Sequence, residues 1–326
     1  MIQLGQLVLE HPFILAPMAG ITSSPFRRLM RRMGSAAVVS ELVSANGISF
    51  GGNKSLRLMN FHEEERPVGV QIFGEDPERL CAAAREVEKL RADFVDINLG
   101  CPVPKVVRKG GGAALCRDLQ VLEKILRSVV SSVKLPVSIK IRSGWDLSSR
   151  NAVEVAQVAA SAGVSWLTLH GRTKGQGYSG EADWDYIAEV KSKSPIPVIG
   201  NGDIATPELA IRRLTDSKVD AVMIGRGMLR NPFIFEQSNA LLTEGSYQIP
   251  DANKYMNLLR DFRNLLEEEF TPRMVFVNAK KFMSWFSSGF NRSTEFRKKV
   301  FQFDQPEKID DLWSEGLKFF VENDRC

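Results

Sequence analysis

Paired cysteines, long apolar runs and a strong excess of one charge are all absent from this sequence. Its 326 residues include four cysteines, which are widely spaced and form no Cys-x-x-Cys pair. Such spacing argues against a structural zinc site and against a disulfide-stabilised secreted domain, and it suits a reducing compartment.

No apolar run approaches the roughly 20 residues that cross a bilayer, and the N-terminus lacks the basic and apolar segments of a signal peptide. We therefore expect a cytoplasmic protein without a membrane span. The formal net charge is +4, from 43 Lys and Arg against 39 Asp and Glu. This mildly basic balance permits an anionic partner but does not require one.

Short apolar runs rich in β-branched residues recur along the first two-thirds of the chain. Eight are predicted strands, at residues 13–16, 36–40, 68–73, 94–98, 137–141, 166–170, 198–201 and 221–224. Between them, segments such as 76–90 and 118–130 carry apolar residues at helical spacing. Alternating buried strands and helices indicate a parallel sheet covered on both faces. Eight such units predict an α/β fold, a closed (β/α)8 TIM barrel, with function at the C-terminal strand ends.

The strand pattern stops near residue 240, and helical patterns follow at 255–270 and 273–286. We predict two domains, a barrel over residues 1–240 and a smaller all-helical domain over residues 241–326. Between residues 271 and 303, seven Lys and Arg accompany one acidic residue. Aromatic residues lie among them: Phe276, Phe282, Trp285, Phe286, Phe290 and Phe296.

Two interpretations of this basic segment stay open. It could be a helical bundle with an aromatic core and a solvated charged face, or a basic surface that follows a nucleic-acid backbone. The acidic residues 267–269 just upstream show that charge is segregated, which favours a basic patch.

One thiol, Cys101, comes directly after a predicted strand, between Gly100 and Pro102. A rigid strand end can hold such a thiol so that it faces a cleft. Free cysteines are otherwise often small buried apolar residues, and sequence alone leaves that interpretation open. Asn98 could reach the same cleft with its amide.

Glycine-rich loops follow the last two predicted strands, at residues 199–204 and 224–227. Glycines expose backbone N–H groups, Arg226 adds a cation, and barrels commonly bind phosphate at these two loops. The alternative is that both loops are only tight turns.

Two further polar residues lie in predicted strands. Lys140 alternates with apolar neighbours, so it points into the barrel, where it needs an anion or an electron-rich ring as a neighbour. His170 ends the sixth strand, where a core role and a functional role are both consistent with the sequence. Residues 175–180 match a dinucleotide fingerprint, but they lack its strand–turn–helix context and indicate a loop over the barrel mouth.

In their order along the chain, these segments resemble the tRNA-dihydrouridine synthases, and the bacterial B subgroup in particular. The segments that carry the resemblance are residues 16–22, Gln71, 98–102, 140–142, 170–173, 201–203 and 225–226. The resemblance implies an enzyme that uses FMN and NADPH, and no metal, to reduce selected uridines of tRNA to 5,6-dihydrouridine. It suggests no obligate protein partner, and we expect a monomer.

The resemblance also implies a role for each site residue. Cys101 would be the general acid that protonates uracil C5 after hydride addition at C6, since free thiols, with a pKa of about 8.5, are protonated at neutral pH. The implied FMN ligands are Pro17, Met18, Ala19, Gln71, Lys140, His170, Asn201, Gly202, Asp203, Gly225 and Arg226. The implied RNA contacts are Asn98, Arg172, Lys280, Lys281, Arg292 and Lys298.

Two other functions stay open. A small-molecule FMN barrel oxidoreductase of the dihydroorotate dehydrogenase type would share the phosphate loops and Lys140, but it would not need a basic helical tail. A non-enzymatic RNA-binding protein with a vestigial barrel would not need Gln71, Cys101, Lys140 and Arg226 together.

Overall fold

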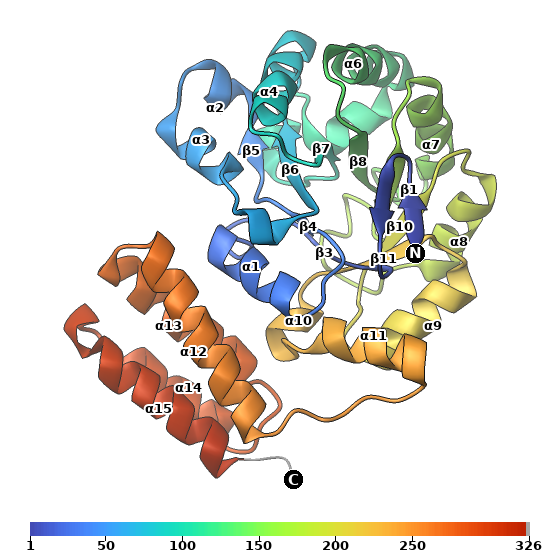
Figure 1. The fold of residues 1–326 in the computed structure, drawn as a ribbon. Helices are drawn as coiled ribbons and strands as arrows, with labels where there is room; N and C mark the ends of the chain where they lie inside the picture. Colours follow the sequence, from blue (N-terminus) through green and yellow to red (C-terminus); the bar gives the residue numbers. More distant parts are fainter. Residues whose placement is uncertain (324–326) are drawn as a thin grey trace.

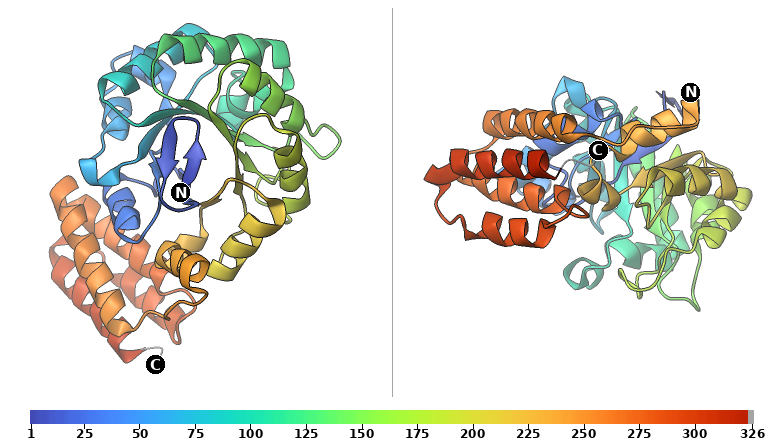
Figure 2. Two further views of the ribbon diagram at one scale, coloured as in Figure 1. Left: turned by 45° about the vertical axis from the view of Figure 1, so that its right-hand side comes forward. Right: turned by 90° about the horizontal axis from the view of Figure 1, so that it is seen from below.

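The structure, a computed structural model, describes residues 1–323 apart from the side chain of Lys54, so Cys326 lies outside the described residues. Eight parallel strands form a barrel surrounded by helices (Figures 1 and 2). They are β3 (Phe13–Leu15), β4 (Val38–Val39), β6 (Val68–Phe73), β7 (Phe94–Leu99), β8 (Val137–Arg142), β9 (Trp166–His170), β10 (Val198–Asn201) and β11 (Ala221–Ile224). The TIM-barrel fold predicted from the sequence is confirmed.

The barrel closes between β3 and the segment that leads into β4. The Leu15 amide donates to the Ala37 carbonyl at 3.0 Å, and the Ala36 amide donates to the Phe13 carbonyl at 2.8 Å. The strand predicted at 36–40 is shorter in the structure, where β4 covers Val38–Val39 and pairs with the start of β6. A separate short strand, β5 (Val43–Ser44), which was not predicted, pairs with the end of β6.

An antiparallel hairpin that was not predicted from the sequence covers the N-terminal end of the barrel (Figure 2). It consists of β1 (Ile2–Leu4) and β2 (Leu7–Leu9). Leu4 and Leu9 are buried in one cluster with the barrel residues Phe94 and Trp166. This apolar cover closes one end of the barrel, so the polar site has to lie at the other end.

The two outer helices that were placed from the sequence, at 76–90 and 118–130, begin where they are predicted. Asp76 caps α4 by accepting from the Arg79 amide at 3.0 Å, and Asp118 caps α6 by accepting from the Val121 amide at 3.0 Å. The helices of this part are α1 (Ser24–Arg32), α2 (Ala45–Ser49), α3 (Asn53–Met59), α4 (Pro77–Lys89), α5 (Pro104–Val107), α6 (Leu119–Ser132), α7 (Ala152–Ser161), α8 (Trp184–Lys193), α9 (Pro207–Ser217), α10 (Gly227–Arg230) and α11 (Ile234–Glu244).

A bundle of four helices follows and lies against α1 (Figure 1). Its members are α12 (Ala252–Glu269), α13 (Pro272–Phe286), α14 (Ser293–Gln302) and α15 (Ile309–Glu322). Phe26 of α1 stacks on Phe282 with 4.7 Å between ring centroids, and it meets Phe262 edge-on. Among residues 1–323, no helix has both the length and the apolar character that a membrane crossing requires.

The structure gives different roles to the aromatic residues of the basic segment and to the acidic residues that precede it. Five of the six aromatic residues noted above are buried and belong to the core: Phe276, Phe282, Phe286, Phe290 and Phe296. The acidic run is also used internally, because Glu268 pairs with Arg28 at 2.6 Å and Glu269 lies 3.3 Å from His62. The aromatic rings are thus core residues, and the acidic residues connect the bundle to the barrel.

Candidate active site

Polar side chains gather at the C-terminal ends of five neighbouring strands, opposite the apolar hairpin. Gln71 lies on β6, Asn98 on β7, Lys140 on β8, His170 on β9 and Asn201 on β10. The strand register pairs Asn98 with Lys140 and His170 with Asn201. Because the strands are parallel, the structure brings these five predicted residues to the same end of the barrel.

The loop after β7 holds Cys101 half-buried at this end. The Asn98 Oδ1 accepts from the Cys101 amide at 2.9 Å and from the Gly100 amide at 3.2 Å. Gly112 has φ +58° and approaches so closely that a Cβ there would lie 2.9 Å from the Cys101 carbonyl oxygen. The Ala113 amide donates to that oxygen at 3.2 Å. The backbone around the thiol is therefore held from two sides.

Lys140 is held by the side-chain amide of Asn201, which lies two strands away on β10. Its Nζ donates to Asn201 Oδ1 at 3.0 Å, and Asn201 Nδ2 donates to the Met223 carbonyl at 2.8 Å. Burial and the positive charge of Arg142 lower the pKa of Lys140 to about 8, although the Asp96 charge opposes them. An anionic ligand beside Lys140 would offset the free-energy cost of burying its positive charge.

The potential at the barrel mouth is positive. Burial lowers the pKa of His170 far below its usual range, and four nearby cations lower it further. Those cations are Lys140, Arg142, Arg172 and Arg226. The imidazole is therefore neutral at physiological pH.

The two predicted phosphate loops touch each other. Gly227 lies so close to the Ile204 carbonyl that there is no room for a Cβ. Asp203 pairs with Arg172 at 2.7 Å and lies 3.7 Å from Arg226. Burial alone would raise the pKa of Asp203, but hydrogen bonds and the charges of these two arginines lower it overall. Arg226 keeps 59% of its side chain exposed, so the loops offer a cation at the surface of the mouth.

Two arginines hold the loop at residues 175–180. Arg142 donates to the Gly177 carbonyl at 2.8 Å, and Arg172 donates to the Gly180 carbonyl at 2.5 Å. The ring of Tyr178, 66% exposed, lies 5.7 Å from the Arg142 guanidinium and 4.9 Å from that of Arg226.

Neither Arg142 nor Tyr178 was predicted from the sequence as a site residue. A signal existed for Arg142, because it lies two positions after Lys140 in β8 and so shares its face. Nothing local to Tyr178 pointed to the two guanidinium groups that flank it.

The loop that carries Pro17, Met18 and Ala19 is tied to α1. Thr22 Oγ1 accepts from the Met18 amide at 2.9 Å, and the Thr22 carbonyl accepts from Arg27 at 2.8 Å. This loop follows β3, so it lies at the same end of the barrel as the polar cluster.

Comparison with known proteins decides the family. The model of the dihydrouridine synthase (Dus) family matches residues 14–320. This chain belongs to the dihydrouridine synthase family. It is 39% identical over 307 residues to tRNA-dihydrouridine synthase B of Xanthomonas campestris pv. campestris, covering 94% of this chain and 92% of the relative. The same identity extends over 329 residues of the Pseudomonas aeruginosa protein of that name, with 98% and 96% covered.

Solved structures agree on the fold of this dihydrouridine synthase. A 2-naphthoyl-CoA reductase complex matches with a TM-score of 0.58 and 13% identity, over 75% of this chain and 52% of that one. A 6-hydroxypseudooxynicotine amine oxidase from Pseudomonas geniculata matches with a TM-score of 0.57 and 15% identity, over 80% and 52%. At such low identity these likenesses show the barrel alone.

Two of the predicted RNA contacts in the bundle of this dihydrouridine synthase bond to protein carbonyls. Lys281 of α13 donates to the Gly20 carbonyl at 2.6 Å, and the Gly20 amide bonds to the Glu41 carboxylate. Burial lowers the pKa of Lys281, with the Glu41 charge opposing. Lys280 bonds to the Phe303 carbonyl. Lys281 thus links the bundle to the loop at residues 17–19.

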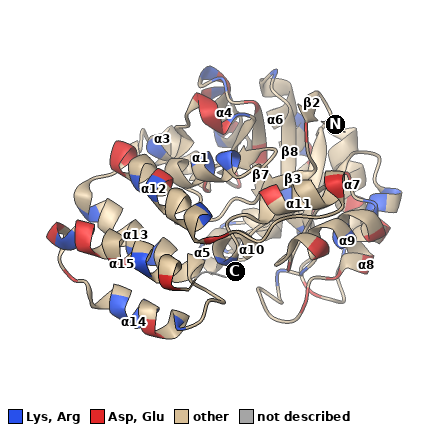
Figure 3. Ribbon diagram, turned by 60° about the horizontal axis from the view of Figure 1, so that its bottom comes forward, with Lys and Arg blue, Asp and Glu red and all other residues tan. Residues whose placement is uncertain are grey.

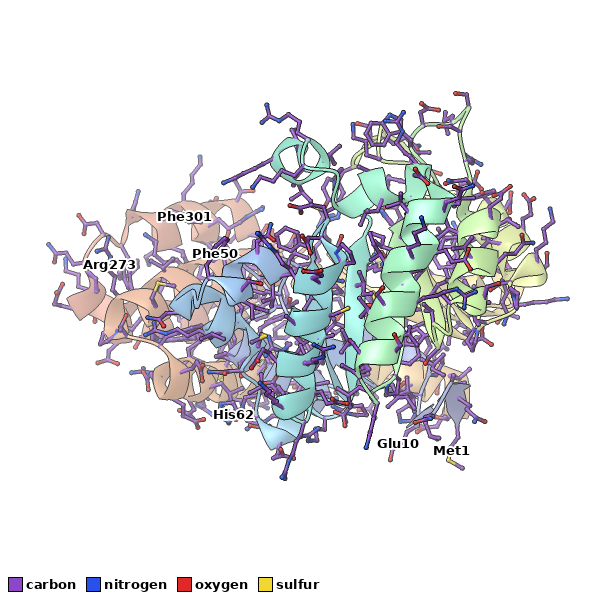
Figure 4. All side chains as sticks on the ribbon, turned by 90° about the horizontal axis from the view of Figure 1, so that it is seen from above. Met1, Glu10, Phe50, His62, Arg273 and Phe301 are labelled. Carbon is purple, nitrogen blue, oxygen red and sulfur yellow. The ribbon has the colours of Figure 1, made fainter. Side chains whose placement is uncertain are left out.

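The other two predicted contacts in the bundle, Arg292 and Lys298, are exposed at α14, where Lys and Arg recur along the ribbon (Figure 3). Arg292 also pairs with Glu295 at 3.1 Å. Phe301, 59% exposed, projects from the same helix, and Arg273 projects from α13 (Figure 4). Phe301 is an exposed aromatic residue of this region that was not predicted from the sequence.

Proposed function

We propose that this protein reduces uridines of tRNA to 5,6-dihydrouridine, with FMN as its cofactor and NADPH as its reductant. The observation that carries the proposal is a thiol, Cys101, held at the cationic mouth of a barrel whose family is named for this product. We propose that residues 1–240 bind the flavin and residues 241–326 bind the tRNA, in a cytoplasmic monomer.

The donors at the barrel mouth fit a phosphate-bearing flavin. Lys140 is an enclosed cation with a lowered pKa, which suits the negative charge of a reduced flavin ring. Arg226 and the glycine-rich loops around Gly202 and Gly225 suit the ribityl phosphate. Of the other proposed FMN ligands, Asp203 orients the arginines, and Pro17, Met18, Ala19, Gln71, His170 and Asn201 line the same end.

The reduction needs a proton donor as well as a reductant. The C5–C6 bond of uracil is conjugated with the C4 carbonyl, so hydride addition at C6 leaves C5 to accept a proton. A bound FMN, reduced by NADPH, would supply that hydride. Cys101 delivers the proton, and Asn98, which holds the thiol loop, positions the base. The uridine has to leave its stack to reach these groups.

The proposal is tested with tRNA from cells that lack dihydrouridine. Purified protein, supplied with FMN and NADPH, is expected to introduce dihydrouridine at defined positions, mapped by sequencing after chemical cleavage. If the protein instead interconverts dihydroorotate and orotate and leaves tRNA unchanged, the small-molecule alternative is correct. Protein that holds no flavin under any condition would point to RNA binding without catalysis.

Removing exposed cations from α14 is expected to weaken tRNA binding in a salt-dependent way. The slope of log K against log salt should become shallower by about 0.7 to 0.9 for every phosphate that the protein no longer neutralises. We expect this for Arg292→Ala and Lys298→Ala, measured by titration at several salt concentrations. Lys124→Ala, an exposed lysine on α6 far from the bundle (Figure 1), is the matched control. Equal slopes for all three variants would place the RNA elsewhere.

A further inference from the structure

A buried carboxylate lies beneath the site and is not used by the chemistry proposed above. Asp96 is on β7, and 4% of it is exposed. Its Oδ1 accepts from the Ser138 hydroxyl at 2.6 Å, and its Oδ2 accepts from Gln71 Nε2 at 2.6 Å. Both partners are themselves almost fully buried. Asp96 therefore accepts hydrogen bonds from two buried side chains inside the barrel.

From Asp96 a chain of hydrogen bonds reaches the thiol loop. Gln71 Oε1 accepts from Asn98 Nδ2 at 2.8 Å. Asn98 Oδ1 accepts from the backbone amides of Gly100 and Cys101, at 3.2 and 2.9 Å. The hydrogen bonds therefore run without a gap from the barrel interior to the backbone that carries the thiol.

The direction of this chain is fixed at its far end. Backbone N–H groups can only donate, so Asn98 has to face Cys101 with its oxygen and Gln71 with its NH₂ group. Gln71 then has to present its own oxygen to Asn98, which turns its NH₂ group toward Asp96. The arrangement works only if position 96 offers an acceptor.

We propose that Asp96 is a positioning residue whose oxygen holds Gln71 and Asn98 in the one amide orientation that the Gly100 and Cys101 N–H groups require, and thereby holds the backbone of Cys101. The inference rests on the proposed function for its catalytic consequence, because Cys101 is the proposed proton donor. Reversing the two amides would point Asn98 Nδ2 at two N–H groups, leaving three donors and no acceptor at the thiol loop.

The chain keeps its direction whether or not Asp96 is ionised. Burial raises the pKa of Asp96, while hydrogen bonds from Gln71 and Ser138 and the Lys140 charge oppose the shift. A proton on Oδ1 could be donated to the Ser138 hydroxyl, which can in turn donate to the Val95 carbonyl at 3.5 Å. Oδ2 would still accept from Gln71. The proposed role of Asp96 therefore requires an acceptor oxygen facing Gln71 and does not require a negative charge.

An asparagine at position 96 is expected to depend on Ser138. In Asp96→Asn, the Ser138 hydroxyl accepts from the new NH₂ group and so keeps the amide oxygen turned toward Gln71. Without that hydroxyl, the new NH₂ group has no partner at position 138, and only the NH₂ group of Gln71 still favours one orientation of the new amide. Ser138→Ala should therefore matter far more in the Asp96→Asn background than in the wild type, where both oxygens of the carboxylate accept.

The experiment is a double-mutant cycle on the full-length protein with FMN. Asp96→Asn and Ser138→Ala are each expected to lower kcat for dihydrouridine formation by about twofold to threefold, and the double variant by roughly a hundredfold. KM for tRNA should change little. A double-variant effect that is only the product of the single effects overturns the proposal, and so does a hundredfold loss in Asp96→Asn alone, which would mean that the charge acts.

A second measurement does not depend on activity. Hydrogen exchange of the peptide that contains the Gly100 and Cys101 amides is expected to be at least about tenfold faster in the double variant than in either single variant. Unchanged hydrogen exchange would overturn the positioning role of Asp96 even if the activities changed. If the wild type makes no dihydrouridine, the proposed function fails. The hydrogen-exchange measurement still tests whether Asp96 positions the Cys101 backbone.

The matched control is Ser143→Ala in the Asp96→Asn background. Ser143 directly follows β8, is buried, and has no hydrogen-bond partner for its hydroxyl among the described residues. This double variant is expected to behave like Asp96→Asn alone. If Asp96→Asn with Ser138→Ala does not fold, Ser138→Cys replaces Ser138→Ala, because a thiol is only a weak acceptor. A result equal to the Ser143→Ala control would then contradict the proposal.

Discussion

Replacing Cys101 with alanine is expected to lower the rate of dihydrouridine formation by about 10²- to 10⁴-fold, because general-acid catalysis by a positioned group contributes that much. The thiol lies on a loop held by Asn98 and by the close approach of Gly112, so its removal should not disturb the barrel. FMN should remain bound, since the phosphate loops and Lys140 are untouched. The measurement is the anaerobic reoxidation of NADPH-reduced flavin by tRNA in a single turnover.

Cys81→Ala is the matched control for this prediction. Cys81 is also a free, half-buried thiol, but it lies on α4 outside the barrel. It should leave the single-turnover rate close to that of the wild type. If the rate of Cys101→Ala were instead within a few-fold of the wild type, the general acid would be a different group.

The sequence predicts the barrel well because its strands are buried on both faces. A continuous apolar run such as Ala221–Ile224 can be recognised without reference to its neighbours. The hairpin of β1 and β2 is harder to predict, because its strands are three residues long and only Leu4 and Leu9 are fully buried. Their burial depends on the barrel end that they cover.

The site was predictable to the extent that each residue lies at a strand end. Lys140 and Asn201 could be placed at one end of the barrel from the strand pattern alone, although their mutual hydrogen bond could not. Lys281 shows the limit more clearly, because its partner, the Gly20 carbonyl, is 261 positions away in the sequence. A basic segment alone does not distinguish a lysine that contacts RNA from one that connects two parts of a protein.

Replacing Glu65 with alanine is expected to destabilise the protein by about 3–5 kcal/mol, the usual cost of leaving a buried charge unpaired. Glu65 is fully buried and pairs with Arg27 at 2.5 Å. It also accepts from the Ser24 hydroxyl at 2.5 Å and from the His62 amide at 3.0 Å. The loss would be a large share of a typical stability of about 5–15 kcal/mol. Urea unfolding followed by two probes, fluorescence and circular dichroism, measures it.

The expected effect is large because the variant leaves the buried charge of Arg27 without its acidic partner. Its remaining bonds go to the carbonyls of Thr22 and Asn60, at 2.8 and 2.9 Å, which are neutral acceptors. Glu63→Ala is the matched control, since Glu63 also pairs with an arginine but is 82% exposed, so its loss should change stability little. Equal effects of the two variants would show that the buried pair adds no more than a surface pair does. A larger effect for Glu65→Ala would show that the stability of the fold depends on the buried Arg27–Glu65 pair.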